Sequence, residues 1–139
     1  IYCSHNLEHY YRHDVSKVLS GFLHVLKSGG VAHITVPDVY QVMRITIERG
    51  LDVDDLLYIS PAGPITVLDV LYGYSIEIER SGNEFFAHKT GFTNKSLSAA
   101  LSRAGFSKGY STVGNLVISA LAFKDQPDPE MLTLFGLPN

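Results

Sequence analysis

Histidine and carboxylate side chains gather near the start of the chain, where their spacing suggests chemistry. The group comprises His5, Glu8, His9 and His13. On one continuous helix, imidazoles at every fourth residue would share a face and could bind a metal ion. Asp14, however, is a typical N-cap residue, which predicts a helix that starts only after His13. We therefore predict no metal site here. The open interpretations are structural hydrogen bonds by Glu8 and His9, or contacts with a cofactor or substrate.

Two predicted strands flank this group. Residues 1–4 form a short apolar strand, and residues 31–36 form a second strand rich in β-branched residues. Between them, apolar residues at spacings of three and four predict a helix that Gly29-Gly30 ends. Strands joined by a helix usually lie parallel, and ligands bind beyond their carboxyl ends. Ser4-His5 and Pro37-Asp38 occupy those ends, so we expect the functional site there.

The rest of the chain predicts more helices and a closing hairpin. We expect helices at 38–50 and 66–72, and a third that begins after Thr93 and ends at Gly105. Strands at 106–112 and 116–123 are joined by so short a turn that they should be antiparallel. Residues 125–139 predict an extended tail with at most one helical turn, and its apolar side chains need a partner surface.

Two longer segments carry a resemblance to a known family. They are "YCSHNLEHYYRHDVSKVLSGFLHVLKSGGVAHITVPD" and "FFAHKTGFTNKSLSAALSRAGF". In this order they resemble the second half of a class I S-adenosylmethionine-dependent methyltransferase. The resemblance implies an α/β fold: the C-terminal part of a Rossmann-like methyltransferase fold, with parallel strands, crossover helices and a terminal antiparallel hairpin. Residues 1–124 would form this partial domain, with 51–92 as a variable insertion or lid over the substrate.

The resemblance also implies roles for particular residues. The cofactor would be S-adenosylmethionine, contacted by Ser4, His5, Asn6 and Glu8. The acceptor would contact His9, His88 and Lys89. His5 would be the catalytic base and Asp38 a second candidate, because methyl transfer needs a positioned acceptor and, for some acceptors, proton removal. Two simpler interpretations stay open: Asp38 as a helix cap, and His88-Lys89 as a solvated basic pair.

One departure from the family pattern leads to an alternative function. The glycine-rich turn and the acidic residue that hold most of the cofactor in the family would precede Ile1, so we interpret the chain as the C-terminal portion of a longer protein. The alternative is a non-catalytic remnant or an interaction module that forms homo-oligomers through its first strand or its tail. A third hypothesis is a metal-dependent hydrolase that uses the three early histidines.

The amino-acid composition limits the kinds of partner and the cellular location that we expect. The net charge of −3 argues against a nucleic-acid surface, which normally carries a basic stripe, and favours a small-molecule substrate. No apolar stretch approaches the roughly 20 residues that span a bilayer, so no membrane partner is expected. The single cysteine, Cys3, excludes an internal disulfide and predicts a reducing, cytoplasmic location and a core position.

Overall fold

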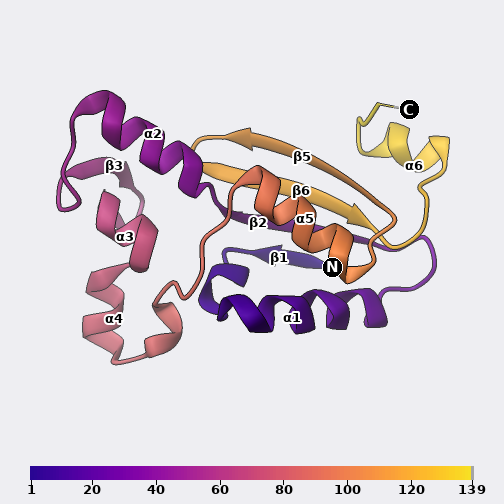
Figure 1. The fold of residues 1–139 in the computed structure, drawn as a ribbon, viewed down its shortest axis with the longest axis horizontal. Helices are drawn as coiled ribbons and strands as arrows, with labels where there is room; N and C mark the ends of the chain where they lie inside the picture. Colours follow the sequence, from indigo (N-terminus) through magenta and orange to yellow (C-terminus); the bar gives the residue numbers. More distant parts are fainter. Residues whose placement is uncertain (139) are drawn as a thin grey trace.

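The computed structural model describes residues 1–138 and has a mixed α/β fold (Figure 1). Its main sheet has four strands in the order β1-β2-β6-β5. These strands span Tyr2–Ser4 (β1), Val31–Pro37 (β2), Val117–Phe123 (β6) and Lys108–Gly114 (β5). A separate antiparallel pair comprises β3 and β4. The α/β class predicted from the sequence is therefore confirmed.

The pairing of the main sheet also follows the prediction. β1 lies parallel to β2, whereas β6 pairs antiparallel with both β2 and β5. β5 and β6 form the expected terminal hairpin. Its turn residues are Asn115 and Leu116, with φ of 50° and 64°. Positive φ at both central residues is the geometry that matches the twist of a two-residue hairpin. Leu116 thus lies in the turn and not in the strand where the prediction placed it.

Helix α1 (Arg12–Val25) connects β1 to β2 and begins three residues earlier than predicted. Asp14 is not its N-cap; the N-cap is Tyr11, and the Asp14 carboxylate accepts a hydrogen bond from Lys17 Nζ at 3.0 Å within the first turn. A carboxylate in the first turn interacts favourably with the positive end of the helix dipole. Asp14 therefore stabilises the start of α1 from within its first turn and not as its cap. The helix also ends before Gly29, which instead provides the left-handed residue of the following turn.

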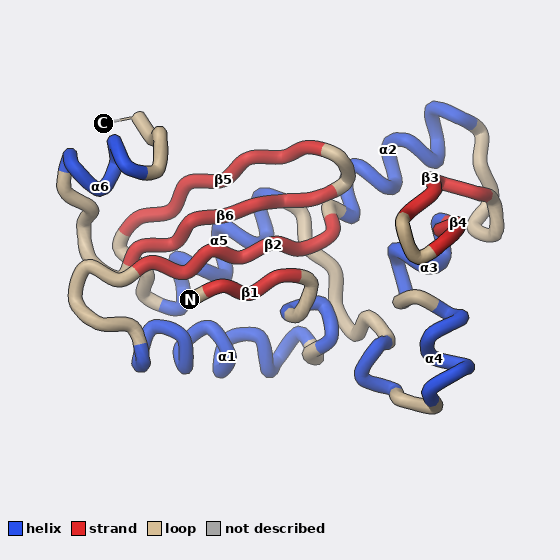
Figure 2. Tube along the Cα trace, turned by 180° about the vertical axis from the view of Figure 1, so that it is seen from behind, coloured by secondary structure: helices blue, strands red, loops and turns tan. Residues whose placement is uncertain are grey.

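Helices α1 and α5 (Asn94–Ala104) cover one face of the main sheet. Seen from behind, α5 lies beyond the strands, and α1 runs along the edge of the sheet next to β1 (Figure 2). Alternate sheet residues supply the core under the helices: Cys3, Ala32, Ile34, Val36, Ile118, Ala120 and Ala122. Cys3 is thus a core residue, as predicted. The opposite face is mixed: His33 Nε2 lies 2.8 Å from Ser119 Oγ, and the apolar Leu121 and Phe123 lie on the same face.

The capping of two predicted helices is confirmed. Asp38 caps α2 (Val39–Arg49), and Gly50 ends this helix with φ of 63°. Thr93 caps α5 through a capping box with Ser96, and Gly105 ends α5. Both patterns depend on residues within a few positions of the helix ends, which explains why the sequence alone predicts them.

Residues 51–92 form a second, smaller part beside the carboxyl ends of β1 and β2, to the left in Figure 1. It contains β3 (Leu56–Ser60), β4 (Gly63–Thr66), α3 (Val67–Tyr72), α4 (Ser75–Ser81) and the 3₁₀ turn η2 (Glu84–Phe86). The predicted helix at 66–72 is confirmed as α3, capped by Thr66. The β3–β4 hairpin and α4 were not predicted. Residues 51–92 are called the side lobe below. The side lobe packs against α2, and the two share a core around Val42, Leu57 and Val70.

The tail forms one short helix, α6 (Pro129–Leu134), as the single predicted turn suggested. Its partner surface lies within this chain: Leu132 is buried, and the Phe135 ring packs edge-on against Phe123 at 5.9 Å. Among the described helices, none has the length and apolar character needed to cross a membrane.

Candidate functional site

The carboxyl ends of β1 and β2 place the first predicted site residues at one edge of the sheet. The His5 amide donates to the Thr35 carbonyl oxygen at 2.9 Å, and Thr35 Oγ1 donates to Ser4 Oγ at 2.8 Å. His5 has φ of 47°, in the left-handed region that few residues other than glycine adopt. This conformation turns the chain sharply out of β1, so that the following residues return over the end of the sheet.

The 3₁₀ turn η1 (Leu7–His9) then carries Glu8 and His9. Leu7 is fully buried in the core and anchors this turn. The Glu8 side chain is only 2% exposed, and neither carboxylate oxygen has a hydrogen-bond partner among the described residues. Its nearest charge is His5, whose Nδ1 lies 3.5 Å from Glu8 Oε1. Burial of a carboxylate without donors is costly, so this group needs a partner.

His88 reaches the same place from a distant part of the chain. The amides of Lys89 and Thr90 both donate to the Glu8 carbonyl oxygen, at 2.8 and 3.2 Å. The rings of His9 and His88 meet edge to face with centroids 5.0 Å apart. Metal-ligating atoms of Glu8, His9 and His88 all lie within 4.8 Å of one another. The structure therefore brings together three of the residues predicted to contact a cofactor or substrate.

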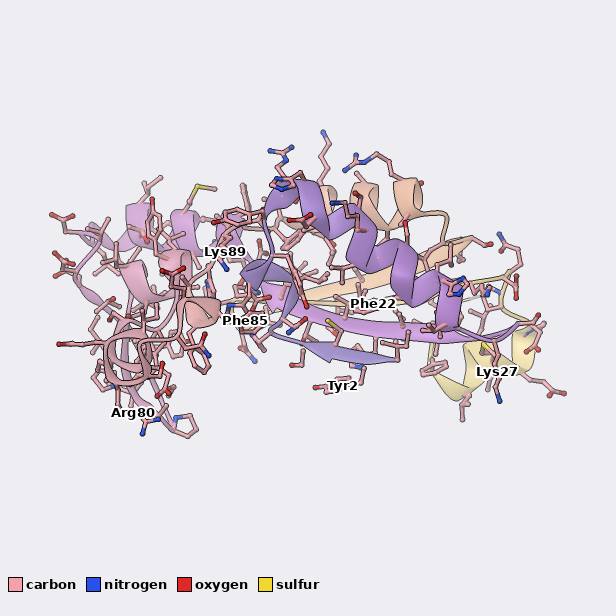
Figure 3. All side chains as sticks on the ribbon, turned by 90° about the horizontal axis from the view of Figure 1, so that it is seen from below. Tyr2, Phe22, Lys27, Arg80, Phe85 and Lys89 are labelled. Carbon is pink, nitrogen blue, oxygen red and sulfur yellow. The ribbon has the colours of Figure 1, made fainter. Side chains whose placement is uncertain are left out.

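A cavity of about 160 Å³ adjoins this cluster, between the strand ends and the side lobe. His5, Pro37 and the hairpin turn line it from the sheet side, whereas Tyr58, Asp69, Tyr74 and His88 line it from the side lobe. The side lobe therefore lies where the predicted lid would have to be. Figure 3 shows Phe85 and Lys89 at the junction between the side lobe and the rest of the molecule.

The pKa values of His5 and His88, the two histidines that line this cavity, are shifted in opposite directions. The neighbouring Glu8 carboxylate raises the pKa of His5, and this outweighs the partial burial of the ring. Burial lowers the pKa of His88 below its ordinary value, although the ring also contacts the Val70 carbonyl oxygen. His88 is therefore neutral at pH 7, while His5 gains positive charge more readily than a free histidine.

Three other predicted or considered residues lie apart from this cluster. The Asp38 carboxylate accepts a hydrogen bond from the Tyr40 amide at 3.0 Å as the cap of α2, and it lines a different cavity. Lys89 Nζ lies over the Tyr11 ring, 5.3 Å from its centroid. His13 is 76% exposed, with Nε2 3.2 Å from Asp14. The three early histidines thus do not form one group, because His13 lies on α1 and His9 on η1.

The remaining predicted residue, Asn6, lies between the strand and η1. It is half-buried, and its carbonyl oxygen accepts the His9 amide at 3.1 Å. Asp69 and Tyr58 were not predicted as site residues. Asp69 follows Thr66 by three positions, and this spacing signals a capping box but carries no sign that the side chain lines a cavity.

Comparisons with known proteins bear on the fold only. No family model matches the sequence, and no curated protein matches it. The chain is similar to a solved structure described as a possible exported protein from Bordetella parapertussis, with a TM-score of 0.52 and 16% sequence identity. The match covers 91% of this chain and 38% of that one, so this chain spans well under half the length of its neighbour. At this identity the likeness supports a shared mixed α/β arrangement and assigns no activity.

Proposed function

We propose that the chain is part of an S-adenosylmethionine-dependent methyltransferase of the Rossmann-like type, acting on a small-molecule acceptor. The observation that carries the proposal is the position of the family-like segment. Its two strands pair in parallel, and His5 and Pro37 at their carboxyl ends line a cavity. A terminal antiparallel hairpin completes the sheet, as the resemblance implies. Ligand binding at this edge is the general rule for open α/β sheets.

The proposed roles agree with the positions of the residues in the structure. Ser4, His5, Asn6 and Glu8 lie where a cofactor could contact the end of β1. His5 is the stronger candidate for the base because it lines the cavity and is 52% exposed. Asp38 is the weaker candidate because its carboxylate already caps α2. His9 and His88 lie on the side-lobe side of the cluster and would face the acceptor, with Lys89 more distant.

A complete cofactor site needs more than these residues. In the proposed enzyme, a glycine-rich turn upstream of Ile1 would bind most of the S-adenosylmethionine. The side lobe would act as the lid over the acceptor. The cytoplasmic location expected from a single cysteine belongs to the same proposal.

A binding measurement tests the proposal. The intact mass of the full-length protein is recorded first. S-adenosylhomocysteine is then titrated into that protein by isothermal calorimetry. We expect micromolar binding, weakened about tenfold in His5→Ala by the loss of one polar contact and unchanged in His13→Ala. Absence of binding to the folded protein would overturn the methyltransferase proposal.

One observation favours the alternative, a self-associating module without catalytic activity. β1 ends the strand order of the main sheet, and its Tyr2 is 71% exposed. An edge strand with an exposed side chain can pair with another chain. Sedimentation velocity distinguishes the two: the alternative requires a dimer that dissociates when Tyr2→Pro removes a backbone donor from the free side of this edge strand, whereas a monomer at all concentrations excludes it.

A further inference from the structure

The cluster of Glu8, His9 and His88 has features that neither a cofactor contact nor a structural role explains. The Glu8 carboxylate is the clearest of them. Buried ionised groups normally have ion-pair or hydrogen-bond partners, because desolvation without them costs several kcal/mol. Here both oxygens lack a hydrogen-bond partner among residues 1–138, and the His5 imidazole at 3.5 Å is the nearest group of opposite charge. The Glu8 carboxylate therefore keeps two acceptor oxygens to which a cation could bind.

The two histidines are oriented as metal ligands usually are. His9 Nδ1 lies 3.3 Å from the Ala87 carbonyl oxygen, and His88 Nδ1 lies 2.9 Å from the Val70 carbonyl oxygen. A carbonyl oxygen can only accept, so each Nδ1 carries the proton and each Nε2 keeps a free lone pair. Histidines that bind metals commonly donate the other ring N–H to a backbone carbonyl in this way, which fixes the ring and its tautomer.

We propose that Glu8, His9 and His88 form a binding site for one divalent transition-metal cation of the zinc type. Two imidazoles and one carboxylate favour zinc and its neighbours over magnesium or calcium, which prefer oxygen ligands. In a tetrahedral site with bonds of about 2.1 Å, ligand atoms lie about 3.4 Å apart, so the cluster would contract from its present 4.8 Å around the ion.

The fourth position of such a site would be open. The cavity that His88 lines also contains His5, and no other described residue completes the set of ligating atoms. Three protein ligands with one position left for water or substrate is the pattern of catalytic zinc sites, whereas structural sites are closed by a fourth residue. A bound water or a substrate oxygen would take that position.

The site differs from the one that the sequence suggested and we rejected. The histidines at positions 5, 9 and 13 would have needed one helix face, and His13 lies elsewhere on α1. His88, held by the backbone bonds from Lys89 and Thr90 to Glu8, takes the third position. The inference does not depend on the methyltransferase proposal, since it concerns only these three side chains.

The test is a metal titration of the whole protein after removal of metal with a chelator. Cobalt(II) is added and its visible d–d absorption recorded, and zinc is then titrated by calorimetry. We expect one equivalent to bind. Glu8→Gln and His88→Ala should each weaken binding more than about 100-fold, since loss of a ligand should exceed the effect of losing a second-shell partner. His13→Ala is the matched control, an exposed neighbouring histidine, and should bind as the wild type does.

A second measurement uses the wild-type protein, in case a variant fails to fold. Zinc should shift the imidazole Nε2 resonances of His9 and His88 in nitrogen NMR spectra and leave those of His13 and His24 in place. In thermal unfolding, zinc should raise the Tm of the wild type but not that of Glu8→Gln. Failure to bind an equivalent of cobalt or zinc, or equal binding by Glu8→Gln and the wild type, would overturn the proposal.

Discussion

The backbone amide of Lys89 donates a hydrogen bond to the carbonyl oxygen of Glu8 at 2.8 Å. Thr90 donates to the same oxygen, so two amides from the side-lobe connection are fixed to the turn at the end of β1. Because these bonds join backbone to backbone, they determine where His88 lies relative to Glu8 and His9. The candidate site thus depends on a backbone contact between two segments that are far apart in the sequence.

Gly73→Ala should strongly destabilise the connection that carries His88. Gly73 has φ of 103°, and a Cβ there would meet the Phe86 carbonyl oxygen and lie 2.9 Å from Ala87 Cα. Strain of this kind costs on the order of 3 kcal/mol in the free energy of unfolding. Gly82→Ala, with φ of 63° and open space around it, should cost only about 1 kcal/mol. Urea unfolding measures both, and equal effects would contradict the close packing at Gly73.

The Asp69 carboxylate should stabilise the side lobe in a pH-dependent way. It accepts hydrogen bonds from the amides and hydroxyls of Thr66 and Ser75, at 2.6 to 3.0 Å. Burial alone would raise the pKa of Asp69, but these bonds, those from Ser75 first, outweigh burial and lower it. Because the unfolded carboxyl has the ordinary, higher pKa, the contribution is complete above about pH 4 and is lost as the pH falls through the native pKa.

Asp69→Asn tests this dependence. At pH 7 the variant should lose about 2 kcal/mol of unfolding free energy, because the four donors lose a charged acceptor and one of its two oxygens becomes an NH₂ group that cannot accept. The difference from the wild type should shrink as the pH falls below about 4. Asp54→Asn removes an exposed carboxylate and should change stability little at pH 7. A difference for Asp69→Asn that stays constant down to low pH would show that the charge of Asp69 is not responsible.

Two substitutions of Asp38 distinguish a helix-capping role from a role as catalytic base. Asparagine caps helices about as well as aspartate but cannot act as a base at neutral pH. Asp38→Asn should therefore preserve both the unfolding free energy and S-adenosylhomocysteine binding, whereas Asp38→Ala should cost about 1 kcal/mol through loss of the Tyr40 contact. If Asp38→Asn folds normally but abolishes methyl transfer once an acceptor is known, Asp38 has a catalytic function after all.

Two leucines on the tail helix α6, one buried and one exposed, test how the tail packs on the rest of the chain. Leu132 is 7% exposed, and Leu134, on the same helix, is 80% exposed. Leu132→Ala should lower the free energy of unfolding by about 2 kcal/mol through lost burial. Leu134→Ala should have almost no effect, since leucine and alanine differ little in helix propensity. Similar losses for both variants would mean that the tail docks differently in solution.

Much of the fold could be predicted because its signals are local. Asp38, Thr66 and Thr93 cap their helices, and Gly50 and Gly105 end two of them, by interactions that span only a few residues. The two parallel strands and the closing hairpin followed from β-branched runs separated by a helix or a short turn. Where the local signal was ambiguous the prediction was wrong or incomplete, as for Asp14, which fits a helix cap and a first turn equally well.

The sequence by itself identified the end of β1 as the place where a site is expected, with Ser4, His5 and Glu8 as candidates, because the order of strand, helix and strand determines the carboxyl edge of the sheet. Only the tertiary structure decided which side chains share it. His88 joins Glu8 and His9, whereas Asp38 and His13 face elsewhere. The physical reason is that backbone hydrogen bonds from Lys89 and Thr90 to Glu8 close a long loop, and such a contact leaves no periodicity or spacing in the sequence.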